Sequence, residues 1–492
     1  MQNSTPIFPG FHLQTLRRTP RTRQQRLAAE LAELKTKSID QLGEVFRGFI
    51  GSGSLDPAAS GPNSRRRLYS KANTFWAFLS QVLHPDPGCQ EVVRKMQSYA
   101  ALKGLAIPSS STASYCEARV RLPEQDLRAV FERTAMEMDR LASEAGTFGR
   151  RVVVADGTGL SMPDTATNQH RWPQQSQQKP GCGFPSMKLT ACFSLQSGAL
   201  LSYATGSKHT HELTLLRSQW DVFRPGDILL ADKGFCNYRD LATLSEQGVD
   251  SLMAMRKKYP IKEAKALRQL GHDDLLVSWS KPQRVGSFSA QEWDTLPSRI
   301  RLRQIRVRIN IPGFRSREIY LITTLLDEQK YPAAMLADLY FQRWDVELFF
   351  RDIKITMGMD VLRCKSPEMI RKELLMHLIA YNCVRRLMLE AAEEAGLAVR
   401  TVSFKGALQA LRNWEPHLNQ LRISRNERFR LISELYACIT DKTLCIRPER
   451  SEPRAVKRRP KNHHLLTKPR NQMVVPKHRN RNWLNKGEKA LS

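Results

Sequence analysis

Helical periodicity dominates the first third of the chain. Apolar residues recur every three or four positions in RQQRLAAELAELKTKS, ANTFWAFLSQVL, QEVVRKMQSYAAL and EQDLRAVFERTAMEMDRLASEAG, which predicts a run of helices between residues 22 and 150. Between the last two, Gly104 and Pro108 indicate a turn, and Ser109 to Thr112 offer N-caps for a short helix ending in Arg119 and Arg121. This pattern is compatible with a helix-turn-helix DNA reader, although an ordinary turn in a helical bundle would look the same.

Strand patterns begin at Arg150. Three short segments of apolar and β-branched residues come first, RRVVVAD, MKLTACFSL and ALLSYATG. Two more strands, DILLAD and DSLMAMR, then alternate with the helical segments HELTLLRSQWDVF and YRDLATLSEQG. Three successive strands followed by alternation predict an antiparallel meander extended by parallel strands, which is the order of an α/β, ribonuclease-H-like fold.

The later sequence divides into three further parts. Residues 259–325 alternate in DLLVSWS, RIRLRQIRVRINI and REIYLITTL, which predicts a strand-rich insertion, and helical periodicity returns from Ala333 to about Cys438. We therefore expect a helical N-terminal DNA-binding domain (1–149), a catalytic domain (150–395) with a β-rich insertion (about 259–325), and a helical C-terminal region (396–446). The remaining tail (447–492) is basic and poor in apolar pattern, so we expect a disordered electrostatic arm.

The charge balance favours a polyanionic partner. The formal net charge is +29, which would attract nucleic acid and release its condensed counterions. A ribosome-associated protein or a merely basic enzyme would show the same excess. We expect no membrane partner, because no long uncharged apolar run and no secretory signal are visible, and a location in the cytosol or at the nucleoid. His209, His211 and Glu212 lack a further suitably spaced metal ligand, so we expect them to cap the helix that follows rather than to bind zinc.

Two aspartates stand at strand ends. Asp156 ends the first apolar strand in VVVADGTG, and Asp232 ends the fourth in ILLADKGF. Acids at such positions, followed closely by glycine, sit where sheets present catalytic groups. An aspartate near a glycine is also a common turn former, so the pair alone is weak evidence.

A third acid is predicted by helical spacing. In LADLYFQRWDVELFFRDIKITMGMD, four residues share one polar face at 3.6 residues per turn: Tyr340, Arg343, Glu347 and Lys354. Beside that face we expect an apolar stripe to pack on the sheet, made by Phe341, Trp344, Leu348 and Ile355. A surface helix in which Glu347 pairs with Arg343 and Arg351 is the alternative.

These residues resemble a known family. DGT around Asp156, ADKGF around Asp232 and an ungapped Tyr-x2-Arg-x3-Glu-x6-Lys pattern are similar to those of bacterial DDE transposases of insertion-sequence family four. The similarity extends to TFWAFLSQVL, STASYCEARVRLPE and PGCGFPSMKL, and covers most of residues 60–400. It implies a ribonuclease-H-like core whose catalytic, metal-binding acids are Asp156, Asp232 and Glu347.

Three carboxylates placed together call for cations. Like charges about 4 Å apart repel by roughly 1 to 4 kcal/mol per pair, so the cluster is unfavourable until cations enter. Hard oxygen ligands select Mg²⁺ or Mn²⁺, and two such ions can activate an attacking hydroxyl and stabilise the leaving oxygen. We therefore expect two Mg²⁺ or Mn²⁺ ions as cofactors.

The resemblance also implies DNA contacts. Arg343 and Lys354 would hold phosphates and Tyr340 would donate its hydroxyl to the backbone. Relatives stack a flipped base on an aromatic residue of the insertion, for which Tyr320 is the nearest candidate. Arg256 and Lys257, after the fifth strand, are candidate contacts, with a solvated turn as the alternative.

The implied activity is cut-and-paste transposition. Its partners would be double-stranded transposon ends and target DNA, its assembly a DNA-synapsed homodimer, and its intermediates hairpin ends. A structure-selective nuclease on the same core would cut but fail to join. A catalytically silent DNA-binding regulator is a third possibility, against which the presence of all three acids argues.

Overall fold

The computed structural model describes most of the chain from residue 68 onward. The described residues are 46, 49–51, 55, 68–85, 87–102, 106–142, 147–255, 264–283, 290–309, 318–418, 425–444, 466–469 and 472. Within these ranges no helix is both long enough and apolar enough to cross a membrane. The predicted basic tail falls almost entirely outside the described residues.

Helices precede the sheet, as the periodicity predicts. They are α3 (Lys71–Leu83), α4 (Cys89–Leu102), α5 (Ala113–Arg121) and α6 (Glu124–Ala142). Helix α3 begins after Ser70, whose hydroxyl accepts the Asn73 N–H at 3.2 Å and so satisfies one of the free donors of the first turn. Helix α6 then packs against the long central helix α13 (Pro367–Glu394).

The first five strands form the predicted meander with parallel extensions. β1 (Val152–Ser161) pairs antiparallel with β2 (Ser186–Ser194), which pairs antiparallel with β3 (Leu200–Gly206). β4 (Ile228–Ala231) lies parallel to β1, and β5 (Asp250–Ala254) lies parallel to β4. The resulting order is β3-β2-β1-β4-β5.

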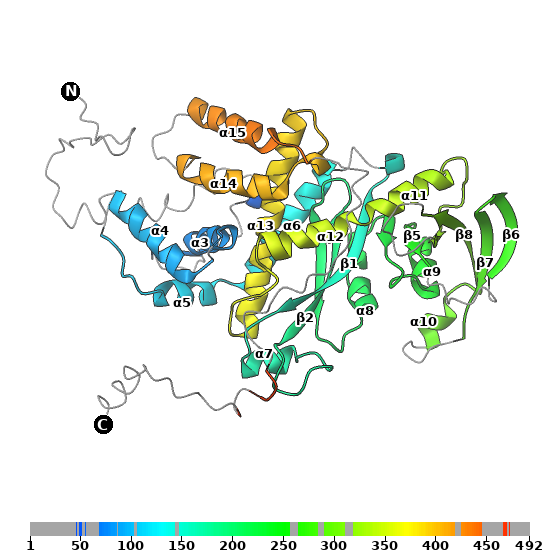
Figure 1. Cartoon of the computed structure of the whole chain (residues 1–492), viewed down its shortest axis with the longest axis horizontal. Helices are drawn as coiled ribbons and strands as arrows, with labels where there is room; N and C mark the ends of the chain where they lie inside the picture. Colours follow the sequence, from blue (N-terminus) through cyan, green and yellow to red (C-terminus); the bar gives the residue numbers. More distant parts are fainter. Residues whose placement is uncertain are drawn as a thin grey trace.

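The strands of the predicted insertion continue this sheet. They are β6 (Ala264–Gly271), β7 (Asp274–Ser280), β8 (Arg299–Arg308) and β9 (Glu318–Thr323), with the short helix α10 (Ala290–Asp294) before β8. β9 pairs antiparallel with β5, so the described strands make one nine-stranded sheet that ends in β9-β8-β7-β6 (Figure 1). The insertion is therefore an extension of the catalytic sheet and not a separate sheet.

The insertion is also tied to the segment before the next helix. Arg303 of β8 is almost fully buried, and its Nε donates to Asp274 Oδ1 of β7 at 2.8 Å. Its Nη1 donates to the carbonyl of Tyr331 at 2.6 Å. A buried guanidinium is tolerated only when it is paired and hydrogen-bonded in this way, so the outer strands are held in a defined position.

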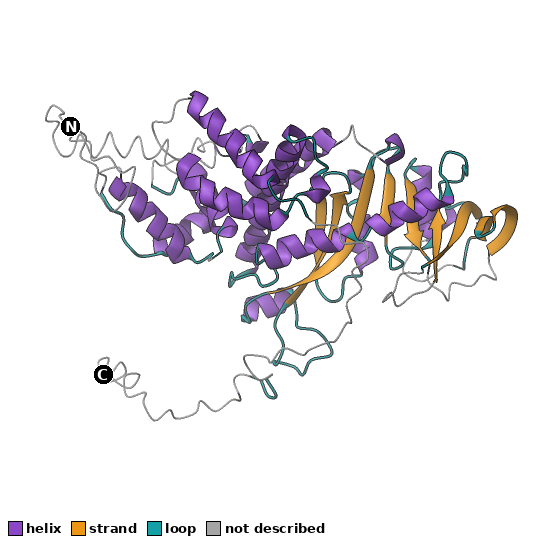
Figure 2. Ribbon diagram, turned by 45° about the horizontal axis from the view of Figure 1, so that its top comes forward, coloured by secondary structure: helices purple, strands orange, loops and turns teal. Residues whose placement is uncertain are grey.

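Alternation along the strands produces two apolar faces. Val152 and Val154 of β1 belong to the cluster that includes α3, α6 and α13, whereas Val153 and Ala155 belong to the cluster on the α8 and α9 side. Figure 2 shows the sheet with helices gathered along its first five strands. The helices not yet placed are α7 (Ala166–Arg171), α8 (Glu212–Arg217), α9 (Tyr238–Glu246), α11 (Ala333–Gln342), α12 (Asp345–Arg351), α14 (Phe404–Leu418) and α15 (Arg425–Thr440).

Helix α13 fastens the far edge of the sheet. The side chain of Asn382, fully buried, accepts the N–H of Leu200 at 2.9 Å and donates to the Leu200 carbonyl at 2.9 Å. The hydroxyl of the preceding residue, Tyr381, donates to the Gly198 carbonyl at 2.6 Å. These contacts satisfy backbone groups next to β3 that the sheet itself does not pair.

Candidate active site

The two aspartates lie side by side on neighbouring strands. Ala155 of β1 is in register with Ala231 of the parallel strand β4, so the residues that follow, Asp156 and Asp232, come next to each other at strands about 4.8 Å apart. By alternation, Asp156 shares the face of Val154, which is the face covered by α13. The register therefore brings the two aspartates together as predicted. The prediction that Asp156 ends its strand is wrong, because β1 continues to Ser161 in its pairing with β2 and only its pairing with β4 stops at Ala155.

Each aspartate is oriented by a backbone donor. The Gly157 N–H donates to Asp156 Oδ1 at 2.7 Å, and the Gly234 N–H donates to Asp232 Oδ1 at 2.6 Å. A Cβ at position 234 would lie 2.8 Å from Asp232 Oδ1. Glycine is needed there because any side chain would collide with the carboxylate that the turn presents.

Glu347 completes the group. It lies in the first turn of α12 and is exposed. The pKa of Asp156 is raised to about 6: burial is the largest cause, the charges of Asp232 and Glu347 add to the rise, and the Gly157 N–H and Arg343 oppose it. The three carboxylates are therefore close enough to feel one another electrostatically.

Arg343 and Tyr340 border the acids. Arg343 is buried, and its Nη1 lies 4.0 Å from Asp156 Oδ2. Its guanidinium carbon is 5.7 Å from the ring centroid of Tyr340 and 5.5 Å from that of Trp344. Burial raises the pKa of Tyr340 and Asp232 adds to the rise, while Arg343 opposes it. Tyr340 thus lies within electrostatic range of Asp232.

The side chain of Lys354, seven residues after Glu347, reaches the sheet face on which Asp156 lies. Its Nζ donates to Thr158 Oγ1 at 2.9 Å. Thr158 follows Asp156 by two residues on β1, and residues so spaced share a face of the strand. The structure therefore brings all four residues of the Tyr-Arg-Glu-Lys pattern to the strands that carry the aspartates.

The predicted packing of the apolar stripe is wrong. Phe341, Trp344, Leu348 and Ile355 are 36 to 66% exposed, and the sheet is contacted instead through Val346, Phe349 and Phe350. The ring centroid of Phe193 in β2 lies 5.4 Å from that of Phe349 and 5.3 Å from that of Phe350.

The error comes from assuming one uninterrupted helix. The chain leaves α11 after Gln342, restarts as α12 at Asp345 and ends in a π-helical turn at Asp352–Thr356. Each irregularity changes the angle between successive side chains, so a constant 3.6-residue period selects the wrong apolar face. The alternative, in which Glu347 pairs with Arg343 and Arg351, is not what the structure shows. Arg343 lies near Asp156 instead, and Arg351 pairs with Asp352 at 3.7 Å.

Other predicted residues lie elsewhere. Tyr320 of β9 packs with the cluster on the α8 and α9 side, the sheet face opposite to that of Asp156, so the structure does not bring it to the acids. Arg256 and Lys257 fall outside the described residues. The expected cap is confirmed, because His211 precedes α8 and its Nδ1 accepts the Leu213 N–H at 3.2 Å.

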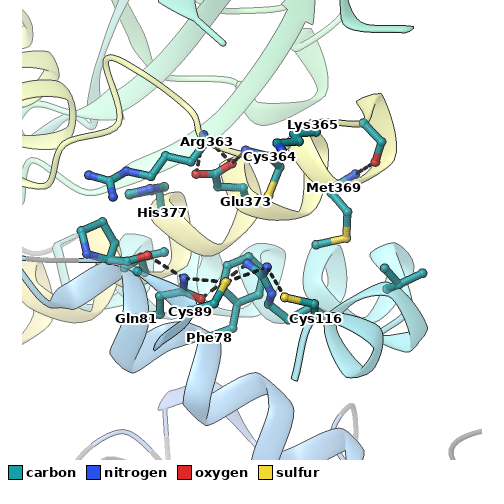
Figure 3. Close-up of a pocket in the computed structure, with 16 residues that line it drawn as sticks. Phe78, Gln81, Cys89, Cys116, Arg363, Cys364, Lys365, Met369, Glu373 and His377 are labelled. Carbon is teal, nitrogen blue, oxygen red and sulfur yellow. Dashed lines mark hydrogen bonds between the residues drawn. The ribbon is translucent and has the colours of Figure 1, made fainter. Parts of the chain in front are cut away.

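The candidate DNA-reading helix α5 turns one of its arginines inward. A cavity of about 540 Å³ lies between α3, α5 and the start of α13, lined by Cys89, Cys116 and Cys364 among others (Figure 3). Arg119 is buried there, and its Nη2 donates to Cys89 Sγ at 3.1 Å. Arg119 is therefore a structural residue of this cavity wall, and any DNA contact by α5 must come from its other side chains.

The acids suit divalent cations chemically. They offer hard oxygen ligands, and burial, together with the charges of Asp232 and Glu347, raises the pKa of Asp156, so a cation would favour its ionised form. Within the described ranges, however, no three Asp, Glu, His or Cys side chains converge closely enough to hold one ion as they stand. One oxygen of each aspartate accepts a glycine N–H, which leaves the other oxygen of each carboxylate for an ion.

Comparisons with known proteins decide the family. Residues 147–383 match the family model described as "Transposase DDE domain". The putative transposase InsL of insertion sequence element IS186A from Escherichia coli (strain K12) is 38% identical over 269 residues, which span 49% of this chain and 67% of that protein. The chain belongs to the DDE transposases of the IS4 family. Transposase InsG of IS4 itself, from the same organism, is 27% identical over 334 residues, 67% of this chain and 72% of InsG.

The chain is thus a DNA transposase, and the family to which it belongs depends on divalent metal ions. A solved structure, the piggyBac transposase synaptic complex with hairpin DNA, is also similar, with a TM-score of 0.40 and 11% identity over 84% of this chain and 87% of that chain.

Two features of the site were not predicted from the sequence. The hydroxyl of Thr158 contacts Lys354, and Trp344 is exposed beside Arg343. The DGT motif contains Thr158, but nothing in a single sequence links that threonine to a lysine 196 residues away.

Proposed function

We propose that this transposase cuts and joins DNA at the carboxylates of Asp156, Asp232 and Glu347, on a ribonuclease-H-like core. The observation that carries the proposal is that Asp156 and Asp232 lie side by side on the adjacent parallel strands β1 and β4, where burial and then the charges of Asp232 and Glu347 raise the pKa of Asp156. When bound there, two Mg²⁺ or Mn²⁺ ions would supply Lewis acidity for attack by water or a 3′-hydroxyl and for departure of the leaving oxygen.

The residues around the acids would hold the DNA backbone. Arg343, packed between two aromatic rings and 4.0 Å from Asp156, presents a planar fork suited to a phosphate. Lys354 would add a point charge, and the hydroxyl of Tyr340 a hydrogen bond.

The remaining parts of the proposal concern the assembly. The substrates would be the terminal inverted repeats of an insertion sequence and a target duplex, handled by a homodimer in the cytoplasm at the nucleoid. Residues 1–149 would bind the ends, residues 150–395 would carry the chemistry, and the reaction would pass through hairpin ends. A flipped base stacked on Tyr320 is not part of this proposal, because that residue lies on the other face of the sheet.

Conservative substitutions test the assignment. Asp156→Asn, Asp232→Asn and Glu347→Gln should each reduce cleavage at least about a thousandfold, equivalent to about 4 kcal/mol of transition-state stabilisation. End binding in a gel shift should stay largely intact, because the phosphate contacts remain. Asp345→Asn is the matched control, since Asp345 lies on the same helix but pairs with Arg400 at 3.3 Å. Full nicking by Glu347→Gln would refute the assignment.

A strand-transfer assay separates the transposase from a nuclease on the same core. With pre-cut ends and a supercoiled target, joined products are expected in the presence of Mg²⁺ and none after chelation. Cutting without joining would support the nuclease alternative, and end binding with neither reaction would support the silent regulator.

A further inference from the structure

The lysine of the Tyr-Arg-Glu-Lys pattern sits in an unusual turn. Lys354 lies within the π-helical turn Asp352–Thr356, where the Met357 N–H donates to the Asp352 carbonyl at 3.0 Å, five residues back. π-helical turns are rare and occur frequently at functional sites. The wider turn changes the direction in which Lys354 leaves the helix, compared with a continuous α-helix.

The next stretch of chain is attached to β1. The Ser161 N–H donates to the Asp360 carbonyl at 3.0 Å, and the Leu362 N–H donates to the Ser161 carbonyl at 2.9 Å. The N–H of Asp360 in turn donates to the Lys354 carbonyl at 3.2 Å. The backbone around Lys354 is therefore held against the end of the strand that carries Asp156.

The lysine side chain is held by the same strand. The 2.9 Å contact from Lys354 Nζ to Thr158 Oγ1 joins two half-buried residues. Since residues two apart on a strand are about 6.5 to 7 Å apart, Thr158 fixes the ammonium group roughly one such step from Asp156 along the same face. A lysine without such a contact would distribute its charge over many rotamers.

We propose that Thr158 is a positioning residue, whose hydroxyl holds the ammonium group of Lys354 at a fixed place beside the carboxylates, ready to receive a DNA phosphate. This rests on the proposed function only in assigning a phosphate to Lys354. The contact also leaves two ammonium hydrogens for a ligand, because a protonated lysine has three donors.

The kinetics of cleavage at uncut transposon ends form the first test. Thr158→Val, which keeps the shape and removes the hydroxyl, should lower kcat/KM for end cleavage roughly tenfold, the size of one lost charge-assisted hydrogen bond. Thr158→Ser should stay within about twofold of wild type. In a Lys354→Met background, Thr158→Val should have no further effect, because both changes remove the same interaction.

Thr190→Val is the matched control. Thr190 lies on β2 opposite Gly157, and its Oγ1 has no hydrogen-bond partner among the described residues. The same chemical change on the neighbouring strand should therefore leave kcat/KM and the Lys354 dependence unchanged. Equal losses in Thr158→Val and Thr190→Val, or additive losses with Lys354→Met, would overturn the positioning role.

A DNA-free measurement keeps this inference separable from the proposed function. An amine-acylating reagent, followed by peptide mass spectrometry, should modify Lys354 several-fold faster in Thr158→Val than in wild type or Thr190→Val. Unchanged acylation in Thr158→Val would overturn the contact even if the protein cuts DNA. Faster acylation in a protein that fails to cut would uphold the contact and refute the proposed function instead.

Discussion

Asp156 shows how a carboxylate proposed for catalysis lowers the stability of its own fold. Burial and two neighbouring acids raise its pKa to about 6, above the ordinary value of an aspartate. In the unfolded chain the group ionises near pH 4, so above pH 6 the folded state holds a charge that the unfolded state accommodates more easily. The resulting destabilisation is full above pH 6 and fades as the pH falls toward 4.

Asp156→Asn should therefore stabilise the metal-free protein. We expect a gain of about 1 to 3 kcal/mol at pH 8 and about half of that at pH 5, because the folded wild type is mostly protonated there. Urea unfolding in the presence of a chelator measures both values. A gain that is the same at the two pH values, or a loss at pH 8, would contradict the raised pKa.

Asp327 supplies a control of opposite sign. Its Oδ1 accepts the N–H groups of Lys330 and Gln329, each at 3.0 Å, and these bonds lower the pKa of Asp327. A lowered pKa means that the ionised form is favoured in the folded state, so Asp327→Asn should not stabilise the protein at pH 8.

At the level of single residues, the sequence pointed to the three acids but not to the contacts made by the residues around them. Asp156 and Asp232 could be found because each follows an apolar segment and is followed closely by glycine, although Asp156 lies inside β1 and not at its end. Glu347 could be found because of its spacing from Arg343. The partner of Lys354 could not be found, since a hydrogen bond between Thr158 and a residue far along the chain depends on the fold.

Helix α13 is the element on which the sheet edge depends most directly. Asn382→Leu should destabilise the protein by about 2 to 4 kcal/mol, because it leaves the buried N–H and carbonyl of Leu200 without their partners. The midpoint of urea unfolding measures the loss. Asn413→Leu, at an exposed position of α14, should change it little. Similar losses in the two variants would show that the Leu200 contacts contribute nothing specific.

Helices and strands were predicted well where a single hydrophobic period continued without interruption. The helix EQDLRAVFERTAMEMDRLA matches α6, because burial on a fixed face selects a regular pattern. The strand predicted to end at Asp156 was placed correctly but continues to Ser161 in β1. The helix of Glu347 was predicted to exist, but its break after Gln342 and its π-helical turn were not. A period count assumes a constant angle between successive residues, so it cannot show where such irregularities occur.

The charge of the whole molecule is unevenly distributed along the chain. Residues 447–492 contain fourteen Lys and Arg against three Glu. Removing the tail after Arg447 should weaken binding to specific and random duplexes alike and flatten the dependence of log K on log salt, because each basic residue in contact with a phosphate contributes about 0.9 to that slope.

Titrations of an end duplex and a random duplex, each at several salt concentrations, provide the measurement. The specific-to-random affinity ratio should stay close to that of the full chain, since the tail is expected to contact phosphates and not bases. A slope equal to that of the full chain would show that the arm takes no part in binding.

The pairing of β9 with β5 has a mechanical consequence. Because β9 and β8 join β5 through continuous backbone hydrogen bonding, no hinge separates these strands within the described sheet. A load applied at β8 would be transmitted to the strands beside Asp232 as bending of a single elastic sheet. Within the described residues, movement that opens or closes around a duplex would therefore come from the helices, while the sheet stays fixed.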